Sequence, residues 1–363
     1  MDASTSLSVA HLLDAMGGSD RLWGKERVVA FLMREQRASG CIDPLLVTFS
    51  PCRLVDVMAS EGFPVEVLSS RPTHDLDGTF GALGRVLARR PVAVVHSHGY
   101  RANIAARALR VTRRTGGARL ISTCHGWVET TAKLRLYNAI DRWTSMLSDV
   151  TTVPDRRMLA ALPAVTRGRH VLNAVPELDG EQALDAVPSF GAFVAGTLGR
   201  VSEAKGILDV LDVARQFPDR SVAFAIAGDG ELASLVCDAG NNVRYVGYIA
   251  QPEAYLAALD VYVQASHSEG LSLALLEAMR AGKAIVATDV GATRDAVTDG
   301  ESALIVPAGR PAALRDALMR LRDDPVLRAK LGDAARAAFD REFRIERQHE
   351  RFLELYIAGG NGG

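Results

Sequence analysis

The sequence has few cysteines and none in a pair. The four cysteines among its 363 residues are isolated from one another, and no CxxC motif occurs. A disulfide framework and a zinc-binding module are therefore not expected, and the cysteine content fits a reducing compartment, the cytoplasm.

Two further absences exclude other classes of protein. No apolar run approaches the roughly 18 residues of a membrane-spanning helix. Residues 1–13, MDASTSLSVAHLL, lack the basic region and longer apolar stretch that a signal peptide has. The formal net charge is −1, so no overall basic field attracts nucleic acid. With 48% hydrophobic and 23% charged residues, the composition is that of a globular protein, and the length suits two domains.

One segment departs from the balanced charge. Nine arginines and no acidic residue lie in residues 85–119. Four of them have the spacing of a shared helical face: Arg107, Arg110, Arg113 and Arg114. This pattern is typical either of a solvated helix face that is balanced by acids elsewhere, or of a contact with an anionic surface such as lipid headgroups or a phosphorylated acceptor.

Short apolar runs alternate with longer amphipathic segments along most of the chain. The runs that we expect to be strands are 7–13, 45–49, 65–68, 92–96, 120–123, 192–198, 222–227, 243–246, 261–264, 284–288 and 303–306. The segments that we expect to be helices include 25–39, 103–114, 133–147 and 345–357. Such alternation predicts parallel sheets with helices on both faces.

The alternation occurs twice, which predicts two doubly wound domains. The two series are separated by residues 176–189, which hold two prolines, four acids and few large apolar residues, and we interpret this segment as an interdomain linker. In such domains ligands bind beyond the carboxyl ends of the strands, where loops and helix N-termini direct N–H groups at them. Polar residues that directly follow strands are therefore the candidates for a site.

In the first half, small and histidine-containing turns follow the predicted strands. Gly17 and Gly18 follow the first strand, and two glycines let the backbone approach a ligand closely. His96 and His98 form an HxH pattern that can bind a metal, but no further His, Asp or Glu has a matching spacing, so no metal site is expected. His125 also follows a strand, and each histidine can be a structural residue or can bind a sugar hydroxyl or a phosphate.

In the second half, the first strand continues into residues 196–206, GTLGRVSEAKG. Gly199 and Gly206 bracket a loop that carries Arg200 and Lys205 ahead of a helix. Two cations beside a helix N-terminus form an anion site, and two suit a diphosphate better than one phosphate. The loop lacks the GxxxxGK[ST] pattern, so nucleotide hydrolysis of that kind is not indicated. A second close-approach turn, Gly228-Asp229-Gly230, follows the next strand.

The segment 268–279, SEGLSLALLEAM, places two carboxylates eight residues apart in an apolar helix. We expect a helix from about 271 or 272 up to Gly282, with Glu269 in the loop before it and Glu277 in its second turn. A buried carboxylate needs hydrogen-bond donors, and the two hydroxyls of a ribose would supply them. The alternative is a partly exposed ion pair of Glu277 with Arg280.

At this point the residues match a family. Glu269-x7-Glu277 resembles the EX7E signature of the retaining GT-B glycosyltransferases of family four. The resemblance extends from about residue 7 to 357. Further matching segments follow in order: GG at 17–18, VVHSHG at 94–99, STCHGW at 122–127, VLNAV at 171–175, GRVSEAKG at 199–206 and AGDGE at 227–231.

The resemblance implies a fold and an activity. The fold would be α/β, of the GT-B type, with two Rossmann-like domains whose parallel sheets face each other across a cleft. The acceptor-binding domain would span residues 1–180 and be completed by a C-terminal helix, 343–357, that crosses back to it; residues 181–342 would bind the nucleotide sugar. The enzyme would be a metal-independent, retaining hexosyltransferase without a cofactor, acting in polysaccharide biosynthesis.

The resemblance also implies roles for the matching residues. Arg200 and Lys205 would hold the diphosphate and stabilise it as it leaves, Glu269 would contact the donor sugar, and Glu277 would bind the ribose. Further donor contacts would come from Gly17, Gly18, Gly199, Gly228, Gly230, Tyr248, Ile249, Gly270, Leu271 and Ser272.

On the acceptor side, the resemblance implies that His125 would lie beside the reacting sugar, and that His98 and Asn103 would bind the acceptor. The expected partners are a nucleotide sugar and a glycan or lipid-linked acceptor, with no nucleic acid. From the arginine-rich segment we further expect a peripheral contact with the inner face of the cytoplasmic membrane.

Several positions depart from the family pattern. The usual Asn-Gly-Val-Asp is Asn173-Ala174-Val175-Pro176, and the Asp often found before the HxHG strand is absent. The usual Gly-Gly-x-x-Glu is Gly291-Ala292-Thr293-Arg294-Asp295, which affects the donor-sugar end of the site. Two other functions remain as alternatives: a nucleotide-sugar 2-epimerase of the same fold, and a non-catalytic two-domain sugar-binding protein.

Overall fold

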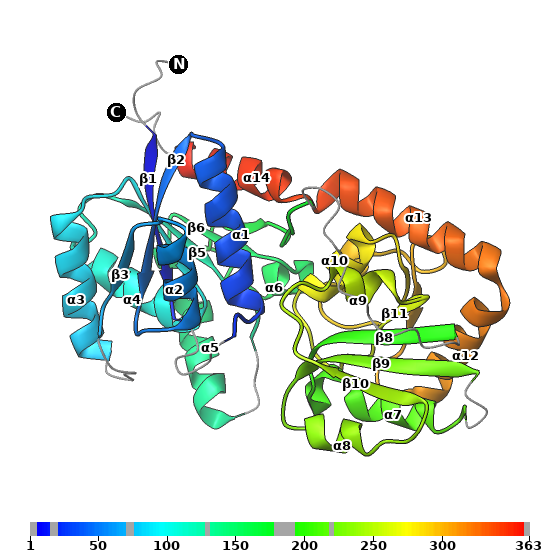
Figure 1. The fold of residues 1–363 in the computed structure, drawn as a ribbon. Coiled ribbons are helices and arrows are strands. Elements are labelled where there is room, and N and C mark those ends of the chain that lie inside the picture. The colour runs from blue at the N-terminus through cyan, green and yellow to red at the C-terminus, as the bar shows by residue number, and fades with distance from the viewer. Residues whose placement is uncertain are drawn as a thin grey trace. The chain divides into compact units, whose positions relative to one another are not determined.

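The structure is a computed structural model that describes residues 6–14, 21–69, 76–127, 131–177, 193–217 and 221–358. It divides into two compact units, Met1–Asn173 with Ile345–Gly363, and Ala174–Arg344. Each unit is a parallel sheet with helices on its faces (Figure 1). None of the described helices combines the length and the apolar character that a membrane span requires.

The first unit holds a seven-stranded parallel sheet in the order β3-β2-β1-β4-β5-β6-β7. Its strands are β1 (Leu7–Leu13), β2 (Ile42–Thr48), β3 (Val65–Val67), β4 (Val94–His98), β5 (Arg119–Thr123), β6 (Val150–Val153) and β7 (Gly168–His170). Its helices are α1 (Gly24–Ala38), α2 (Arg53–Ser60), α3 (Leu76–Arg89), α4 (Tyr100–Val111), α5 (Ala132–Thr144), the 3-10 turn η1 (Ser145–Leu147), α6 (Arg156–Ala161) and α14 (Ile345–Ile357).

The expected strands of this half are all present, but the sequence missed β6 and β7. In β6 two buried threonines, Thr151 and Thr152, replace the apolar residues that mark a buried strand. Thr152 is satisfied by a hydroxyl pair with Thr123 at 2.6 Å between the two oxygens. A polar residue that finds its partner across the sheet leaves no apolar run in the sequence.

The second unit holds a six-stranded parallel sheet in the order β10-β9-β8-β11-β12-β13. Its strands are β8 (Phe193–Arg200), β9 (Val222–Asp229), β10 (Val243–Gly247), β11 (Val261–Gln264), β12 (Ala284–Thr288) and β13 (Leu304–Val306). Its helices are η2 (Glu203–Lys205), α7 (Ile207–Ala214), α8 (Ala233–Cys237), α9 (Glu253–Ala257), α10 (Leu273–Arg280), α11 (Thr293–Ala296), α12 (Pro311–Asp323) and α13 (Pro325–Glu342).

Both sheets reverse their strand order once, between β1 and β4 in the first unit and between β8 and β11 in the second. Parallel pairing throughout, with this order, makes each unit a doubly wound Rossmann-like domain, as the sequence predicted. Ligands of such sheets bind where the order reverses, at the carboxyl ends of the strands.

The last helix, α14, belongs to the first unit, as expected from the resemblance. Phe352 and Tyr356 pack in one apolar cluster with Val9 of β1 and Val94 of β4. The amide nitrogen of Gln348 in α14 also donates to the carbonyl oxygen of Leu172 at 2.9 Å, just before the chain leaves the first unit.

The boundaries of the units lie at 173/174 and 344/345, whereas the sequence placed them at 180/181 and 342/343. The difference has a backbone cause, because Val175 donates to the carbonyl oxygen of Phe343 at 3.1 Å and bridges to Arg344. These contacts join residues 174–177 to the second unit. Most of the expected linker, 176–189, lies outside the residues that the structure describes.

Candidate functional site

A polar pocket lies at the carboxyl ends of β8 and β11, where the strand order of the second sheet reverses. Five of the residues expected at the donor site line it: Gly199, Arg200, Lys205, Glu269 and Ser272. The β8 loop thus places two cations, and the β11 loop a carboxylate, around one small volume.

Lys205 and Glu269 form an ion pair in this pocket, in which the ammonium group donates to the carboxylate. Lys205 ends the η2 turn, which Gly206 closes with a left-handed φ of +69°. The Glu269 side chain is 12% exposed and the Lys205 side chain 31%, so the pair is accessible from the pocket. A diphosphate that enters would compete with Glu269 for the ammonium group.

The two glycine-containing loops pack directly on each other. A Cβ atom on Gly228, at φ +135°, would lie 1.6 Å from the carbonyl oxygen of Gly199. A Cβ atom on Gly230 would lie 2.4 Å from the carbonyl oxygen of Val201. Gly228 and Gly230 therefore shape the Arg200 loop from behind and do not line the pocket.

The loop that carries Glu269 is supported in the same way. A Cβ atom on Gly291, at φ +51°, would lie 2.0 Å from the carbonyl oxygen of Glu269. Ala292 also donates its N–H to the carbonyl oxygen of Gly270 at 3.2 Å. The family's glycine is therefore retained where the Glu269 backbone requires it, although the following residues differ from the family pattern.

Glu277 lies in the second turn of α10 and is 1% exposed. Its alternative partner is otherwise engaged, since Arg280 binds Glu253 at 2.8 Å and the carbonyl oxygen of Pro176 at 2.8 Å. A partly exposed pair of Glu277 with Arg280 is therefore wrong. Burial, with Glu269 and Glu277 nearby, raises the pKa of Tyr262, which places both carboxylates close to this pocket-lining phenol.

The other expected donor residues do not line the pocket. Gly270 and Leu271 precede α10, and Tyr248 and Ile249 follow β10. Tyr248 is exposed and Ile249 half-buried, as positions beside a nucleotide base can be. The Gly17 and Gly18 turn lies outside the described residues.

The sequence missed several polar groups of the pocket. Thr197, Tyr262, Gln264 and Ser266 line it, and all lie on β8 or β11 or directly after β11. Gln264 donates to Thr293 at 3.1 Å, while its Oε1 is buried and accepts no hydrogen bond from the described residues. Gln264 is the last residue of β11, and this position at a strand end could have indicated from the sequence that it faces the pocket.

In the first unit, His98 ends β4 and His125 follows β5 by two residues. The two rings lie 3.2 Å apart, from His98 Nδ1 to His125 Nε2. Burial lowers the pKa of His125 to about 3, so its ring is neutral at physiological pH. Asn103 is fully buried and bonded to Ser97 at 2.8 Å and Asp141 at 3.1 Å, an arrangement that supports a structural role for it.

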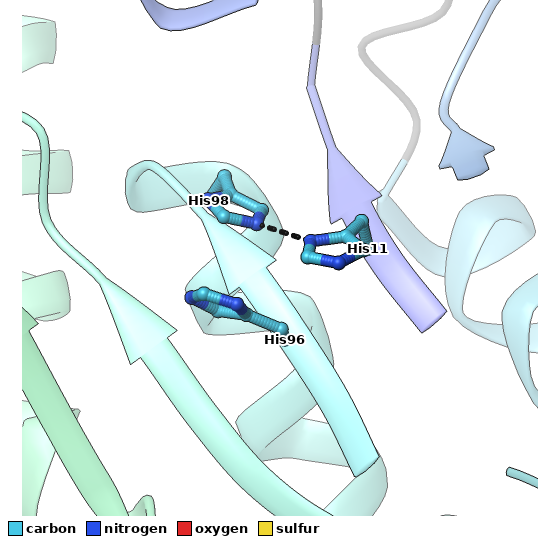
Figure 2. Close-up of side chains that lie close together, drawn as sticks. All are labelled: His11, His96 and His98. Carbon is cyan, nitrogen blue, oxygen red and sulfur yellow. Dashed lines mark hydrogen bonds between the residues drawn. The ribbon is translucent and has the colours of Figure 1, made fainter. Parts of the chain in front are cut away.

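The sequence shows no further histidine near the HxH pattern, but the fold brings a third histidine next to it. His11 on β1 pairs in register with His96 on β4, and the two lie beside His98 (Figure 2). The three buried rings offer nitrogens within 4.8 Å of one another, a spacing at which histidines can hold a metal ion. The sequence could not reveal this cluster because 80 residues lie between β1 and β4.

Part of the arginine-rich segment is used inside the first unit, while Arg85, Arg89, Arg90, Arg113 and Arg114 are exposed. Arg107 is 1% exposed and pairs with Asp141 at 2.8 Å, and Arg110 pairs with Asp149 at 2.7 Å. The shared helical face predicted for the four arginines is wrong, because α4 ends at Val111 and Arg107 points into the unit.

Comparison with known proteins relates both units to one family. Residues 24–176 match the glycosyl transferase 4-like domain, and residues 192–324 match glycosyl transferases group 1. A 2-deoxystreptamine glucosyltransferase of Streptomyces kanamyceticus is 28% identical in an alignment of 214 positions that covers 52% of this chain and 55% of that protein. A phosphatidyl-myo-inositol mannosyltransferase of Mycobacterium leprae is 35% identical over 170 residues, 44% and 43% of the two chains.

The matched segments thus span about half the length of these curated relatives. The fold is that of solved structures such as Anabaena HepE in complex with UDP-glucose, with a TM-score of 0.80, 16% identity, and 97% of this chain and 100% of that chain covered. The chain belongs to the group 1 glycosyltransferases of family four, and its two Rossmann-like units are those of the GT-B fold.

Proposed function

We propose that this protein transfers a hexose-type sugar from a nucleotide-diphosphate sugar to a hydroxyl group of an acceptor. The observation that carries the proposal is the pocket of the second unit, where Arg200, Lys205 and Glu269 surround one volume at the reversal of the strand order. Two cations match a diphosphate, and a carboxylate matches sugar hydroxyls.

The cations would supply most of the catalytic effect. In the transfer, the bond between the anomeric carbon and the diphosphate oxygen breaks, and the acceptor oxygen bonds to that carbon. The acceptor proton goes to the departing phosphate. Negative charge develops on the diphosphate as it leaves, so the fixed charges of Arg200 and Lys205 stabilise the transition state more than the bound donor. This arrangement requires no metal ion.

Glu269 would orient the donor sugar, with no covalent bond to it. We infer retention of the anomeric configuration through a same-face reaction, in which the departing phosphate takes the place of an enzymatic base. Buried Glu277 would bind the ribose hydroxyls, and the unpaired Oε1 of Gln264 would accept a hydrogen bond from the donor.

The donor is identified by a thermal-shift screen against UDP-, GDP- and ADP-sugars, with UDP-glucose first because a structural relative binds it. A ligand at a hundred times its Kd stabilises the folded state by about 2.7 kcal/mol. One nucleotide series should raise Tm, and the proposal fails if none of the three does.

Catalysis is tested with Lys205→Ala and Glu269→Ala, with Lys330→Ala and Glu301→Ala as matched controls on exposed surface away from the pocket. Removing one fixed charge at a leaving group typically costs on the order of a hundredfold or more in kcat. We expect that loss for Lys205→Ala. We also expect a loss of activity for Glu269→Ala, because the donor sugar loses the carboxylate that orients it, and none for the controls. Equal activity of Lys205→Ala and Lys330→Ala would contradict the proposal.

The same assay separates the two alternatives. A 2-epimerase would convert the donor sugar without an acceptor, and a sugar-binding protein would release no nucleoside diphosphate. Product analysis by mass spectrometry, with and without acceptor, distinguishes these outcomes from transfer.

We further propose that the acceptor is lipid-linked or part of an envelope glycan, and that the first unit contacts an anionic membrane, at the inner face of the cytoplasmic membrane. The supporting observation is the inverted polarity of α5 and η1. The inward face holds buried Asn138, Asp141 and Ser145, while the outward face is apolar. The exposed apolar residues follow a spacing of four, three and four: Leu136, Ile140, Trp143 and Leu147.

Such a face suits the boundary between headgroups and acyl chains, where tryptophan is favoured. Lys133, Arg135 and Arg142 give the same segment positive charge, and its one acid, Asp141, is buried. We therefore base the proposed membrane contact on the apolar face of α5 and η1, and the exposed arginines of 85–119 remain a further source of positive charge for it.

A further inference from the structure

Eight side chains of the first unit form one unbroken chain of hydrogen bonds. They come from β1, α1, β4, β5, β6, α14 and the loop after β5. In order along the chain of bonds they are His125, His98, His11, Gln36, Tyr356, His96, Thr123 and Thr152.

The first arm of this chain links His125 to Gln36. His125 Nε2 lies 3.2 Å from His98 Nδ1, and His98 Nε2 lies 3.0 Å from His11 Nδ1 (Figure 2). His11 Nε2 in turn lies 2.7 Å from Oε1 of Gln36. Each of the two inner rings uses both of its nitrogens in this arm.

The second arm links Gln36 to Thr152. The amide nitrogen of Gln36 donates to the Tyr356 hydroxyl at 3.2 Å, and that hydroxyl lies 2.7 Å from His96 Nδ1. His96 Nε2 lies 2.7 Å from the Thr123 hydroxyl, which pairs with Thr152 at 2.6 Å. Because the Tyr356 hydroxyl accepts from Gln36, its own hydrogen goes to His96.

A neutral imidazole has one donor and one acceptor nitrogen, so a hydrogen bond that fixes the role of one nitrogen also fixes the role of the other. Burial keeps the four rings neutral: it lowers the pKa of His11 to about 4 and that of His125 to about 3, and it lowers the pKa of His96 and His98 well below the usual value. A carbonyl oxygen only accepts. Because Oε1 of Gln36 accepts, His11 must carry its proton on Nε2, and its Nδ1 is the acceptor. His98 then donates to that Nδ1 from its own Nε2, which leaves its Nδ1 as an acceptor. His125 in turn donates to His98 from Nε2.

We propose that Gln36 is a positioning residue that sets the tautomer of His125 through His11 and His98. The consequence is that His125 carries its proton on Nε2 and presents an unprotonated Nδ1, which accepts a hydrogen bond from a hydroxyl group and not from a carbonyl or a phosphate. Only the identity of that hydroxyl, on a sugar or an acceptor, rests on the proposed glycosyl transfer.

A metal ion held by His11, His96 and His98 is the competing explanation of the cluster. Lone pairs of imidazole lie in the ring plane, so the ring planes of tetrahedral ligands must converge on the ion. The rings of His11 and His98 instead lie edge to edge, with an interplanar angle of 20° and 3.0 Å between the two facing nitrogens, so these nitrogens point at each other and not at a shared ion. The ring centroids of His96 and His98 lie 4.0 Å apart, with an interplanar angle of 37°. All six nitrogens also have hydrogen-bond partners, as the two arms show, so the hydrogen-bonded chain explains the cluster better than a metal.

The direct test is the protonation state of each ring nitrogen, read from long-range 1H–15N correlation spectra of the full chain with 15N-labelled histidine. We expect the Nε2–H form for His125, His98 and His11. Observation of the Nδ1–H form at His125 would overturn the proposal. This measurement needs no substrate, so it decides the proposal even if no sugar is ever transferred.

Variants show whether Gln36 is the cause. Gln36→Leu removes the acceptor, and the signals of His11, His98 and His125 should then shift toward mixed tautomers. Gln36→Glu keeps an accepting oxygen in either protonation state and should restore the wild-type pattern. Thr123→Val, a matched control at the far end of the second arm, should alter His96 alone. An unchanged His125 in folded Gln36→Leu overturns the proposal; if that variant does not fold, the wild-type spectrum decides.

Zinc addition tests the metal explanation. Stoichiometric Zn²⁺ uptake by elemental analysis, together with loss of the Nε2–H signals of His11 and His98, would also overturn the proposal.

In a transfer assay, Gln36→Leu should lower kcat on the order of tenfold to a hundredfold at an unchanged KM for the donor, and Gln36→Glu should restore it. If wild-type protein transfers no sugar, the proposed function fails while the spectra still decide the tautomer.

Discussion

Arg107 and Asp141 form an ion pair with 2.8 Å between Nη1 and Oδ1, and each side chain is 1% exposed. The pair joins α4 to the inward face of α5. The same carboxylate accepts hydrogen bonds from Asn103 at 3.1 Å and Cys124 at 3.3 Å. Asp141 is therefore the polar anchor that turns the apolar residues of α5 outward.

Removing Arg107 should be costly because the buried charge of Asp141 would be left without its partner. We expect Arg107→Leu to lower the free energy of unfolding by about 3–5 kcal/mol in urea melts. Arg107→Leu with Asp141→Asn should recover part of that loss, since the second change removes the charge and keeps an acceptor. Arg110→Leu, in a more exposed pair, should cost about 1 kcal/mol or less. Equal losses for the two single variants would show that burial of the pair is unimportant.

Glu277→Gln tests the ribose contact. The change keeps the shape of the buried side chain and removes its charge, so a fall in nucleotide affinity of roughly tenfold to a hundredfold is expected, in line with about 1.5–3 kcal/mol for hydrogen bonds to a charged group. Isothermal titration with the nucleoside diphosphate and its 2′-deoxy analogue measures it. Wild-type protein should prefer the ribose form more strongly than the variant does. The same preference in both proteins would place the ribose elsewhere, and Glu301→Gln serves as the control.

The outward face of α5 should hold the protein at anionic vesicles. Leu136→Ser with Trp143→Ser removes two side chains that are 62% and 64% exposed, so vesicle binding should weaken roughly tenfold or more while stability stays within about 0.5 kcal/mol. Sedimentation with phosphatidylglycerol vesicles measures binding, and phosphatidylcholine vesicles isolate the contribution of charge. Val165→Ser, at a position 71% exposed, is the control. Vesicle binding that is unchanged in the α5 double variant but weaker in the Val165→Ser control would refute the membrane contact.

The buried histidines predict a loss of stability in mild acid. The pKa of His11 is 6.5 in the unfolded chain and about 4 in the folded protein, because burial disfavours its charged form. The unfolded chain therefore binds more protons between these values, and the free energy of unfolding falls as the pH decreases through this window. His11 alone should account for about 2 kcal/mol between pH 7 and pH 5.

Urea melts at the two pH values check this expectation. His11→Gln should be less pH-dependent than wild type by about 2 kcal/mol, whatever its stability at pH 7. An identical pH dependence in the two proteins would mean that His11 already titrates normally in the fold.

The sequence predicted the repeated doubly wound fold and five of the thirteen residues that line the pocket of the second unit. Strands such as 261–264 and 284–288 are continuous apolar runs because both faces of a parallel sheet are covered. Arg200, Lys205 and Glu269 directly follow such runs, so parallel strand order alone brings them to one edge. Of the two missed strands, β6 lacks that pattern because its buried threonines find polar partners, and β7 lacks it because it is only three residues long, Gly168–His170.

The amino-acid sequence by itself determined every described strand except β6 and β7, the places where glycine must allow close backbone approach, and which charges line the pocket of the second unit, because each follows from a local pattern. Tertiary structure alone decided the chain of bonds from His125 to Thr152, the inward course of Arg107 and the inverted polarity of α5. These features depend on partners far apart in the chain, such as His11 with His98 and Gln36 with Tyr356. A hydrogen bond between distant residues leaves no periodic trace in either segment, so only the packed fold reveals it.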